Sequence, residues 1–559
     1  MSNKDILLPL YFIPKKSKFA INEKKFLIFL LTGTLITSVI IFINLPSTNS
    51  LSKQDLSHLF LPKFNNSYKF NRNRPKQQEK VIEVDSGNDI PKYVVEPDSN
   101  KENDHKNSLR RDKIKNMTLH AWNSYKKYAW GKNELKPLSR TFHQTGIFGS
   151  GSDLGATIVD SLDTLHIMGL HDEVKLATDW IRKNFNININ SQISAFEVNI
   201  RFIGGFLAIY ALTDEKFYLD KAVEIADALM PIFNTPTGIP YALVNPISKA
   251  VHNYNWAAGS CSILSEVGTF SLEFQYLSDL TGNKIYQEKI DKIYDHLKKN
   301  KNANGLYYNY INPNNGRYCG SQASIGGLAD SFYEYLLKLW LYKNKSDKEL
   351  LDMYLDSIDA LKSHVYLKSK SNLGYFGEYS GNFVNKKMGH LACFAGGLFG
   401  LTAIKVDELN EEKRNMYKEM AVDITNSCHE SYIRTKTHLG PESFGFEPDR
   451  EAMALDRYYI LRPEVIESYF YLWRITKDEK YRDWAWDAAE ALEKYCKTEN
   501  GYSGIKDVNS PDPQKDDVQQ SFFIAETLKY LYLIFSEDDL IPFDKFVFNT
   551  EAHPFRIKA

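Results

Sequence analysis

The sequence predicts an all-α fold of repeated helical hairpins, and three observations support this prediction. From about residue 109 onward, apolar residues recur every three or four positions, as in ADSFYEYLLKLWLY and KYRDWAWDAAEALEKYC, which is typical of amphipathic helices. Strand-like alternation of apolar and polar residues is sparse. A Thr followed five residues later by a Tyr also occurs three times, beginning at Thr213, Thr281 and Thr476. Each copy resembles a turn between two antiparallel helices, with Asp or Gly in the loop.

The spacing of these copies indicates how many hairpins the chain holds. The first two lie 68 residues apart, and the third lies 195 residues further on. A unit of about 65 residues gives roughly seven hairpins over the helical region. A closed ring of hairpins would bury every inner face. An open solenoid is the alternative, although solenoids usually have shorter and more uniform repeats.

The N-terminal region predicts a membrane anchor. Residues 26–43 form an uncharged apolar run of 18 residues, which is at the short end of what spans a bilayer. Lysines cluster before this run and not after it, so we expect the N-terminus to be cytosolic and the rest lumenal. A cleaved signal peptide is the alternative. However, the run is longer than the usual apolar core of a signal, and no small-residue cleavage site follows at once.

The predicted organisation therefore has four parts: a cytosolic tail (1–25), a transmembrane anchor (26–44), a disordered lumenal stem (45–108) and a helical domain (109–559). The stem is rich in Asn, Lys, Asp, Ser and Pro and lacks apolar periodicity, so it cannot bury enough surface to order itself. N-glycosylation sequons at Asn65, Asn116 and Asn344 have meaning only on the lumenal side, although such tripeptides also occur by chance.

Composition excludes several other classes of function. The chain has 69 Lys and Arg against 70 Asp and Glu, for a net charge of -1, so no overall basic field attracts nucleic acid. Its five Cys are too few for a disulfide scaffold and form no zinc-binding pattern. Aromatic residues make up 13% of the chain, enough to build a substantial core.

Acidic residues lie at apolar helix starts and in connecting loops, which converge on one end of a ring of hairpins. LRPEVIES places Glu464 and Glu467 on one helix face, directly after Pro463, which suits a first helical turn. A surface helix whose acids complement its own dipole would explain this pair equally well. Helix caps would likewise explain Asp160, Asp163 and Asp330, a surface ion pair would explain Glu197 with Arg201, and a core histidine would explain His390. The other acids in such places are Glu266, Glu526 and Glu551.

Taken together, these acids indicate carbohydrate chemistry. Carboxylates accept hydrogen bonds from sugar hydroxyls, and pairs of carboxyls cleave glycosidic bonds as acid and base. The aromatic content supplies faces on which pyranose rings stack. No Ser/His or metal–thiolate pattern competes with this interpretation.

Motifs along residues 118–557 resemble the class I α-mannosidases of glycoside hydrolase family 47, and most closely the Golgi branch. The motifs are HAWNSYKKYAWGKNELKP, ATIVDSLDTLHIMGL, GGLADSFYEYLLKLW, MGHLACFAGGLF, CHESYIRTKTHLGPESF, YYILRPEVIESYFYLWR and FNTEAHP. The resemblance implies an (α/α)7 barrel of helical hairpins behind a type II transmembrane helix and a flexible stem. It also implies a Golgi membrane location with the catalytic domain lumenal, the endoplasmic reticulum membrane being the alternative.

The same resemblance implies inverting hydrolysis of terminal α-1,2-linked mannose from high-mannose N-glycans, with one bound Ca²⁺. Glu197 matches the general acid, acting through a water, Asp330 a second catalytic acid and Glu464 the general base. Thr550 matches the one residue that contacts Ca²⁺ directly, through its hydroxyl and carbonyl. The residues that match the sugar site or its neighbours are Arg201, Glu266, Leu328, His390, Arg462, Pro463, Glu467, Phe522, Glu526 and Glu551.

Two further expectations follow from the resemblance. Family members of the endoplasmic reticulum that remove a single mannose carry an arginine two residues before the catalytic aspartate. This chain has Leu328 at that position, so we expect it to trim glycans towards five mannoses. Cys393 and Cys428 match a family disulfide. A non-hydrolytic, mannose-binding quality-control protein on the same scaffold is the alternative function, and a glucan-directed (α/α) hydrolase ranks third because it lacks FNTEAHP.

Overall fold

The computed structural model describes residues 101–558 with the exception of residue 382. The predicted cytosolic tail and transmembrane anchor lie outside the described residues, as do the sequon at Asn65 and most of the predicted stem.

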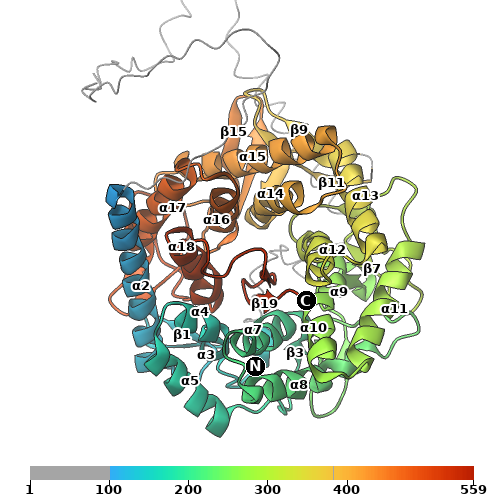
Figure 1. Cartoon of the computed structure of the whole chain (residues 1–559), viewed down its shortest axis with the longest axis horizontal. Helices are drawn as coiled ribbons and strands as arrows, with labels where there is room; N and C mark the ends of the chain where they lie inside the picture. Colours follow the sequence, from blue (N-terminus) through green and yellow to red (C-terminus); the bar gives the residue numbers. More distant parts are fainter. Residues whose placement is uncertain (1–100, 382, 559) are drawn as a thin grey trace, which may run out of the picture. The chain divides into compact units, whose positions relative to one another are not determined.

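The described part of the chain is mostly helical, which confirms the predicted all-α class, and its main helices pack in pairs (Figure 1). In six pairs an inner helix is followed by an outer one. The six pairs are α4 (Leu162–Ile167) with α5 (His171–Asn184), α7 (Gly204–Thr213) with α8 (Lys216–Leu229), α10 (Ser271–Thr281) with α11 (Ile285–Lys299), α12 (Asp330–Tyr342) with α13 (Lys348–Val365), α14 (Ala395–Lys405) with α15 (Glu411–Ile433) and α16 (Glu464–Thr476) with α17 (Lys480–Ala491).

A seventh pair joins the two ends of residues 101–558. The last helix, α18 (Leu528–Ile534), packs against the first, α2 (Lys101–Ala129). Each inner helix also contacts the next inner helix, from α4 through to α18. The pairs therefore form a closed ring, as Figure 1 shows, and not an open solenoid.

The repeated threonines mark the turn within a pair. Thr213, Thr281 and Thr476 are the last residues of α7, α10 and α16. Each hydroxyl donates to the carbonyl four residues earlier and accepts the N–H two residues later. The next residue has a positive φ of 59°, 73° or 58°, which ends the helix and redirects the chain. The sequence repeat is thus the hairpin turn itself.

The connections from an outer helix to the next inner helix are longer, and they carry short helical segments (η denotes 3-10 or π geometry). These segments are η1 (Gly146–Phe148), α3 (Ala156–Asp160), α6 (Ala195–Val198), η2 (Asn199–Ile203), η3 (Met230–Phe233), η4 (Ala258–Ser260), α9 (Leu264–Gly268), η5 (His390–Phe394), η6 (Leu492–Cys496) and η7 (Phe523–Thr527).

Short antiparallel strands occupy the same connections and the C-terminus. The sheets are β1 (Glu134–Lys136) with β2 (Thr141–His143); β3 (Ile193–Ser194), β4 (Leu243–Val244) and β5 (Val251–His252); β6 (Ser262–Ile263) with β7 (Tyr310–Ile311); β8 (Gln322–Ala323), β11 (Glu378–Ser380) and β12 (Phe383–Asn385); β9 (Tyr366–Lys368) with β10 (Gly374–Phe376); β13 (Lys387–Gly389), β14 (Ser443–Glu447) and β15 (Arg450–Ala454); β16 (Lys497–Thr498) with β17 (Gly501–Tyr502); and β18 (Phe546–Phe548) with β19 (Pro554–Arg556).

The C-terminal strand pair lies inside the ring. In Figure 1, β19 is drawn within the circle of inner helices, and β18 and β19 contact α12 and α7 respectively. Val547 pairs with Phe555 across the two strands, and Phe548 and Phe555 are fully buried. Burying these apolar side chains holds the connecting residues, Asn549 to His553, in the interior.

Helix α2 (Lys101–Ala129) includes residues 101–108, which the sequence analysis assigned to the stem. Lys106 and Arg110 both reach Asp483 of α17, at 3.4 and 3.0 Å, and Arg110 also lies over the ring of Trp486 at 5.2 Å. This part of α2 has no apolar periodicity of its own, so contacts with α17 decide its structure.

Cysteine pairing is partly as expected. Cys393 and Cys428 form a disulfide between η5 and α15, which confirms that prediction. A second disulfide joins Cys261 to Cys319 and was not predicted, because 58 residues separate the two in sequence. Cys496 is free and buried.

Among the described residues, one helical stretch, Ala195–Thr213, has the length and apolar character to cross a membrane. Because 83% of its most apolar window is buried inside the protein, it belongs to the core. The predicted anchor at 26–44 lies outside the described residues.

Candidate active site

Arg201 is the centre of a buried ionic cluster at one end of the ring. Its Nε donates to Glu197 Oε2 at 2.8 Å, and its Nη1 donates to Glu551 of the C-terminal segment. Asp160 lies 3.5 Å away, and the guanidinium lies over the ring of Phe522 at 5.5 Å. The predicted i,i+4 pair of Glu197 and Arg201 is therefore formed, and it is buried rather than on the surface.

A second cluster surrounds the start of α16, where the LRPE sequence lies. Glu464 Oε2 lies 2.6 Å from His390 Nδ1, and Arg462 Nη1 lies 3.8 Å from Glu464 Oε1. Burial opposes ionisation of Glu464, but His390 and then Arg462 outweigh it, so the pKa of this carboxyl is lowered. Pro463 precedes α16 and accepts the N–H of Glu467 at 2.8 Å, which sets the predicted helix start.

Arg462 is held by a residue that sequence reasoning did not single out. Glu442 accepts two hydrogen bonds from this guanidinium, at 2.5 and 2.7 Å, in the bidentate geometry typical of strong Arg–carboxylate pairs. Glu442 lies in the GPESF segment, one of the family-like motifs, so its motif was the signal that could have identified it.

Other carboxyls facing these clusters resist ionisation. Burial raises the pKa of Asp330 to about 7, and the nearby charges of Glu334 and Glu464 act in the same direction. Burial raises the pKa of Glu467 to about 8, against the nearby Lys338. Burial also raises the pKa values of Glu526 and Glu551; the charge of Glu551 adds to the shift of Glu526, and the charges of Asp160 and Glu197 add to the shift of Glu551. This end of the ring therefore holds more carboxyl groups than its cations can keep ionised.

Glu266 and Leu328 lie at the edge of the Arg201 cluster. Burial and the nearby Glu197 raise the pKa of Glu266, and the nearby Tyr254 opposes this shift. Leu328 packs against a small apolar cluster that includes Tyr254, and its φ of 78° is in the left-handed region. The carbonyl of Leu328 accepts the N–H of Ser265 at 2.9 Å, which links this loop to the helix that carries Glu266.

Thr550 lies in the turn between β18 and β19. Its N–H donates to the hydroxyl of Tyr335 at 3.2 Å, and Tyr335 donates in turn to the buried Glu273 at 2.7 Å. Asn549 donates to the same Glu273 oxygen at 2.9 Å. Thr550 itself is half-buried, and its backbone N–H is held by this network of partners on α10 and α12.

The structure thus brings every predicted site residue to one end of the ring, and it also shows a supporting network that the sequence did not reveal. Lys529 Nζ donates to Asp163 at 2.6 Å and to the carbonyl of Ala552 at 2.7 Å. His553 lies 3.2 Å from both Asp160 and Asp163. These two aspartates anchor the C-terminal segment rather than cap a helix, a role that depends on residues about 390 positions apart.

Two of the supporting segments have π-helical geometry. Arg201 lies in η2 and Glu526 lies in η7, both with π-helical hydrogen bonding. An additional residue per turn re-aims side chains, and such segments are frequent at functional sites. No sequence pattern that we used indicates π geometry.

The chemistry available here is acid–base catalysis on a polyhydroxylated molecule. The pKa of Glu464 is lowered beside His390 and Arg462, whereas burial raises the pKa of Asp330 to about 7. Buried carboxyls with opposed proton affinities can accept and donate protons at the same pH. Arg201 and Phe522 add hydrogen-bond donors and an aromatic face.

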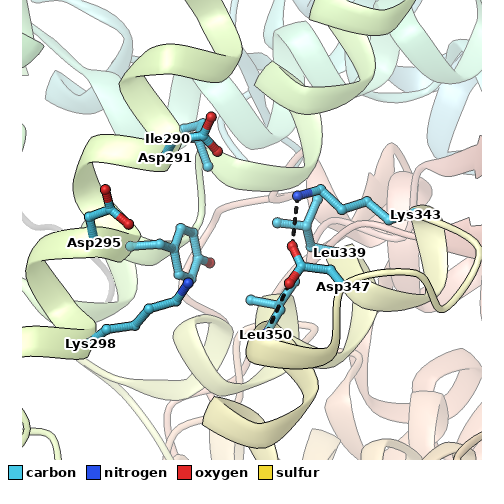
Figure 2. Close-up of a pocket in the computed structure, with 9 residues that line it drawn as sticks. Ile290, Asp291, Asp295, Lys298, Leu339, Lys343, Asp347 and Leu350 are labelled. Atoms are coloured by element: carbon cyan, nitrogen blue, oxygen red, sulfur yellow. Dashed lines mark hydrogen bonds and ion pairs between the residues drawn. The ribbon is translucent and has the colours of Figure 1, made fainter.

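A separate pocket of about 100 Å³ lies between α11, α12 and the start of α13 (Figure 2). Its polar lining includes the Lys343–Asp347 ion pair at 3.0 Å, together with Asp291 and Asp295. None of the predicted site residues lines this pocket, so it does not belong to the candidate active site.

Comparison with known proteins identifies the family. A sequence profile of Glycosyl hydrolase family 47 matches residues 117–557. The mouse (Mus musculus) protein named mannosyl-oligosaccharide 1,2-alpha-mannosidase IB is 54% identical over 448 residues, which cover 80% of this chain and 69% of the mouse protein. A Caenorhabditis elegans protein named mannosyl-oligosaccharide 1,2-alpha-mannosidase is 50% identical over 455 residues, covering 81% and 77%. The solved structure of an alpha-1,2-mannosidase from Trichoderma reesei is similar with a TM-score of 0.73 at 31% identity, covering 81% of this chain and 99% of that one. This chain belongs to glycosyl hydrolase family 47.

Proposed function

We propose that this chain hydrolyses terminal α-1,2-linked mannose from high-mannose N-glycans, with inversion and towards five mannoses. The observation that carries the proposal is that the pKa values of two carboxyls in one cluster are shifted in opposite directions. The pKa of Glu464 is lowered although this carboxyl is buried, whereas burial raises the pKa of Asp330 to about 7. Such a pair supplies the base and the acid that glycoside hydrolysis requires. The names of the relatives supply the linkage and the sugar.

In this proposal Glu464 is the general base, which takes a proton from the attacking water. Glu197 is the general acid, acting through a water, and Asp330 is a second catalytic acid. Arg201 holds Glu197 in place through its 2.8 Å hydrogen bond. Phe522, under the same guanidinium, offers an aromatic face to the sugar.

A bound Ca²⁺ is part of the same proposal. Thr550 would hold the ion directly through its hydroxyl and carbonyl, and Glu526 and Glu551 would hold its waters, whereas Glu467 would line the sugar site. The buried carboxyls fit a divalent cation, because a cation would offset the burial and the like charges that raise the pKa values of Glu526 and Glu551. Within the described residues no group of three His, Cys, Asp or Glu side chains forms a metal cage, which suits coordination by one threonine and waters. When bound, the ion would coordinate sugar hydroxyls.

The location of the enzyme is proposed from its N-terminus. Residues 26–44 would anchor the domain in the Golgi membrane, with a stem between the anchor and α2. The relatives' names concern oligosaccharide processing, which supports a place in the secretory pathway. The endoplasmic reticulum membrane remains the alternative.

The test is incubation of the purified protein with a nine-mannose N-glycan and Ca²⁺. We expect stepwise release of mannose, and β-mannose should be the first anomer detected if the α-linkage is cleaved with inversion. Binding of the glycan without release of mannose would favour the lectin-like alternative and overturn the hydrolytic proposal.

A further inference from the structure

Leu461, directly before residues 462–464, has a backbone conformation that leucine rarely adopts. Its φ of 69° lies in the left-handed region, where the side chain crowds the neighbouring carbonyl oxygen. The residue is fully buried. Such a conformation costs free energy and persists only where the surrounding structure holds it. Because Leu461 lies three residues before Glu464, whatever holds it also bears on the place of that carboxylate.

The turn at Leu461 connects a fixed point of the chain to the start of α16. Tyr459 and Ile505 exchange backbone hydrogen bonds of 2.9 and 2.8 Å, which hold the chain two residues before Leu461. Helix α16 begins at Glu464. The chain passes from this bridge to the helix within residues 460–463, so the conformation of Leu461 sets the direction in which the helix starts.

Two buried hydroxyls hold the two peptide groups that follow. Thr527 Oγ1 donates to the carbonyl of Leu461 at 2.7 Å, and the hydroxyl of Tyr459 donates to the carbonyl of Arg462 at 3.0 Å. Because a peptide group is planar, a hydrogen bond that fixes its carbonyl fixes the orientation of the whole group. The ring of Pro463 restricts the next φ. The backbone that leads into α16 therefore has little freedom.

The hydrogen bond from Thr527 joins two neighbouring segments of the candidate active site. Thr527 is the last residue of η7 and directly follows Glu526. Segment η7 leads into α18, and α18 packs beside α16 (Figure 1). Segment η7 is also held by Thr164 of α4, whose Oγ1 donates to the carbonyl of Ile524 at 3.1 Å. The bond from Thr527 thus ties the segment that carries Glu464 to the segment that carries Glu526.

We propose that Thr527 is a positioning residue for the reaction, because its hydroxyl holds the Leu461 carbonyl and so places the Glu464 carboxylate. This inference rests on the proposed role of Glu464 as general base. A general base must lie within hydrogen-bond reach of the proton that it takes, and a misplacement of about 1 Å can cost on the order of 10²-fold in rate. Thr527 is fully buried, so it acts through the backbone and not on the sugar.

The hydrogen bonds made by His390 and by Thr527 have different effects on Glu464. His390 Nδ1, at 2.6 Å from Glu464 Oε2, orients the end of the side chain. Thr527 fixes the backbone from which that side chain extends. His390 belongs to a separate segment, η5, so a shift of the Leu461 peptide group would move Glu464 relative to its histidine partner.

The first test compares Thr527→Val, which keeps the shape of the side chain but lacks the hydroxyl, with Thr527→Ser, which keeps the hydroxyl. In Thr527→Val we expect kcat to fall on the order of tenfold, with KM changed less than about threefold. Thr527→Ser should keep kcat within about threefold of the wild type, because its hydroxyl can still donate to the Leu461 carbonyl. An equal loss of kcat in both variants would overturn the inference, as would wild-type kcat in Thr527→Val.

Thr402→Val is the matched control. Thr402 is fully buried, and its hydroxyl donates to the carbonyl of Leu398 within α14 at 2.8 Å. Thermal unfolding should show a loss of stability in both valine variants, since each loses a buried hydrogen bond, but only Thr527→Val should lose kcat. A matching loss of kcat in Thr402→Val would assign the effect to general stability and overturn the inference. Thr527→Ala lacks the same hydroxyl and replaces Thr527→Val if that variant does not fold, and the same fall in kcat is expected of it.

The second test is a double-mutant cycle with Glu464→Gln. If Thr527 acts by placing the base, its hydroxyl should matter little once the base is an amide. The double variant should then have a kcat within about twofold of that of Glu464→Gln alone. Losses that multiply would show that Thr527 acts independently of Glu464 and would overturn the inference.

Failure of the proposed function would look different. Wild-type turnover of Glu464→Gln would exclude the base role, whatever Thr527 does. A crystal structure of Thr527→Val tests the positioning independently of catalysis. We expect the peptide group between Leu461 and Arg462 to rotate and the Glu464 carboxylate to move relative to His390. Unchanged positions of both would overturn the inference about Thr527.

Discussion

Glu464 Oε2 and His390 Nδ1 lie 2.6 Å apart, and this contact joins the start of α16 to the η5 segment. The two residues are 74 positions apart in sequence. Their contact accounts for much of the lowered pKa of the Glu464 carboxyl, which burial alone would raise.

Glu464→Gln should abolish most turnover while glycan binding persists. The amide keeps the size of the side chain but cannot accept a proton from water, and loss of a general base typically costs on the order of 10²-fold or more. Turnover and glycan affinity should be measured together. Glu447→Gln, the same change at an exposed position of β14, is the control. Turnover of Glu464→Gln within a few-fold of wild type would exclude the base role.

Thr550→Ala should weaken Ca²⁺ binding, because it removes the hydroxyl ligand and leaves the carbonyl. Calorimetric titration of the metal-free protein with Ca²⁺ measures the affinity, and EDTA should inactivate the wild type reversibly. Thr281→Ala is the control, since Thr281 Oγ1 bonds only within a hairpin turn far from the site. Full activity of extensively dialysed, metal-free enzyme would refute the calcium assignment.

Leu328→Arg should narrow the set of mannoses that the enzyme removes. Leucine offers apolar contact only, whereas a guanidinium can donate several hydrogen bonds to one glycan branch, each worth roughly 1.5–3 kcal/mol when charged. The series of trimmed glycans that each protein produces, compared at equal enzyme concentration, measures the effect. Leu455→Arg, at an exposed site, is the control. Identical ladders, or a wild type that stops at eight mannoses, would contradict the role of Leu328.

The free energy of unfolding should decrease as the pH rises from about 4.5 to about 7, because of the buried carboxyl of Glu273. Burial raises its pKa from 4.5 to about 7, although Tyr335 and Asn549 oppose the shift. The folded state therefore binds this proton more tightly than the unfolded chain does. Stability is lost as the unfolded carboxyl ionises, by roughly 3 kcal/mol at most.

Urea unfolding at pH 5 and pH 7 measures that difference. Glu273→Gln is neutral at both values, so its loss of stability over this range should be smaller than that of the wild type. Glu288→Gln, exposed on the neighbouring helix α11, should behave like the wild type. Equal losses in Glu273→Gln and wild type would show that Glu273 does not titrate in this range.

Asn344 should carry an N-glycan if the domain is lumenal. It is exposed in the turn between α12 and α13, with a φ of 51°, and α12 separates it from Asp330 at the other end of that helix. Treatment with an N-glycosidase should increase the gel mobility of the wild type by more than that of Asn344→Gln. Asn372→Gln, an exposed asparagine outside any sequon, is the control. The same mobility shift in all three proteins would mean that Asn344 is unmodified.

Sequence reasoning could predict features that depend on local pattern. The helical class followed from apolar spacing, and the hairpin turns followed from a threonine whose hydroxyl bonds within its own turn. The start of α16 after Pro463 is local in the same sense. Most acids of the site could be singled out by their positions at apolar helix starts, whereas their roles, and residues such as Leu328 and Thr550, came from the family-like motifs. Those motifs also supplied the pairing of Cys393 with Cys428.

Local sequence patterns therefore predict which segments form helices, where they turn and which side chains are available at their ends. Which of those side chains meet depends on the packing of distant segments. Closure of the ring brings α2 against α18 and the C-terminal turn against Arg201, 350 residues away in sequence. The tertiary structure also sets the pKa of each carboxyl. Glu464 and Glu467 share one helix face, but only Glu464 has a histidine beside it. Burial and neighbouring charge set these proton affinities, and both depend on contacts between residues that are distant in the chain.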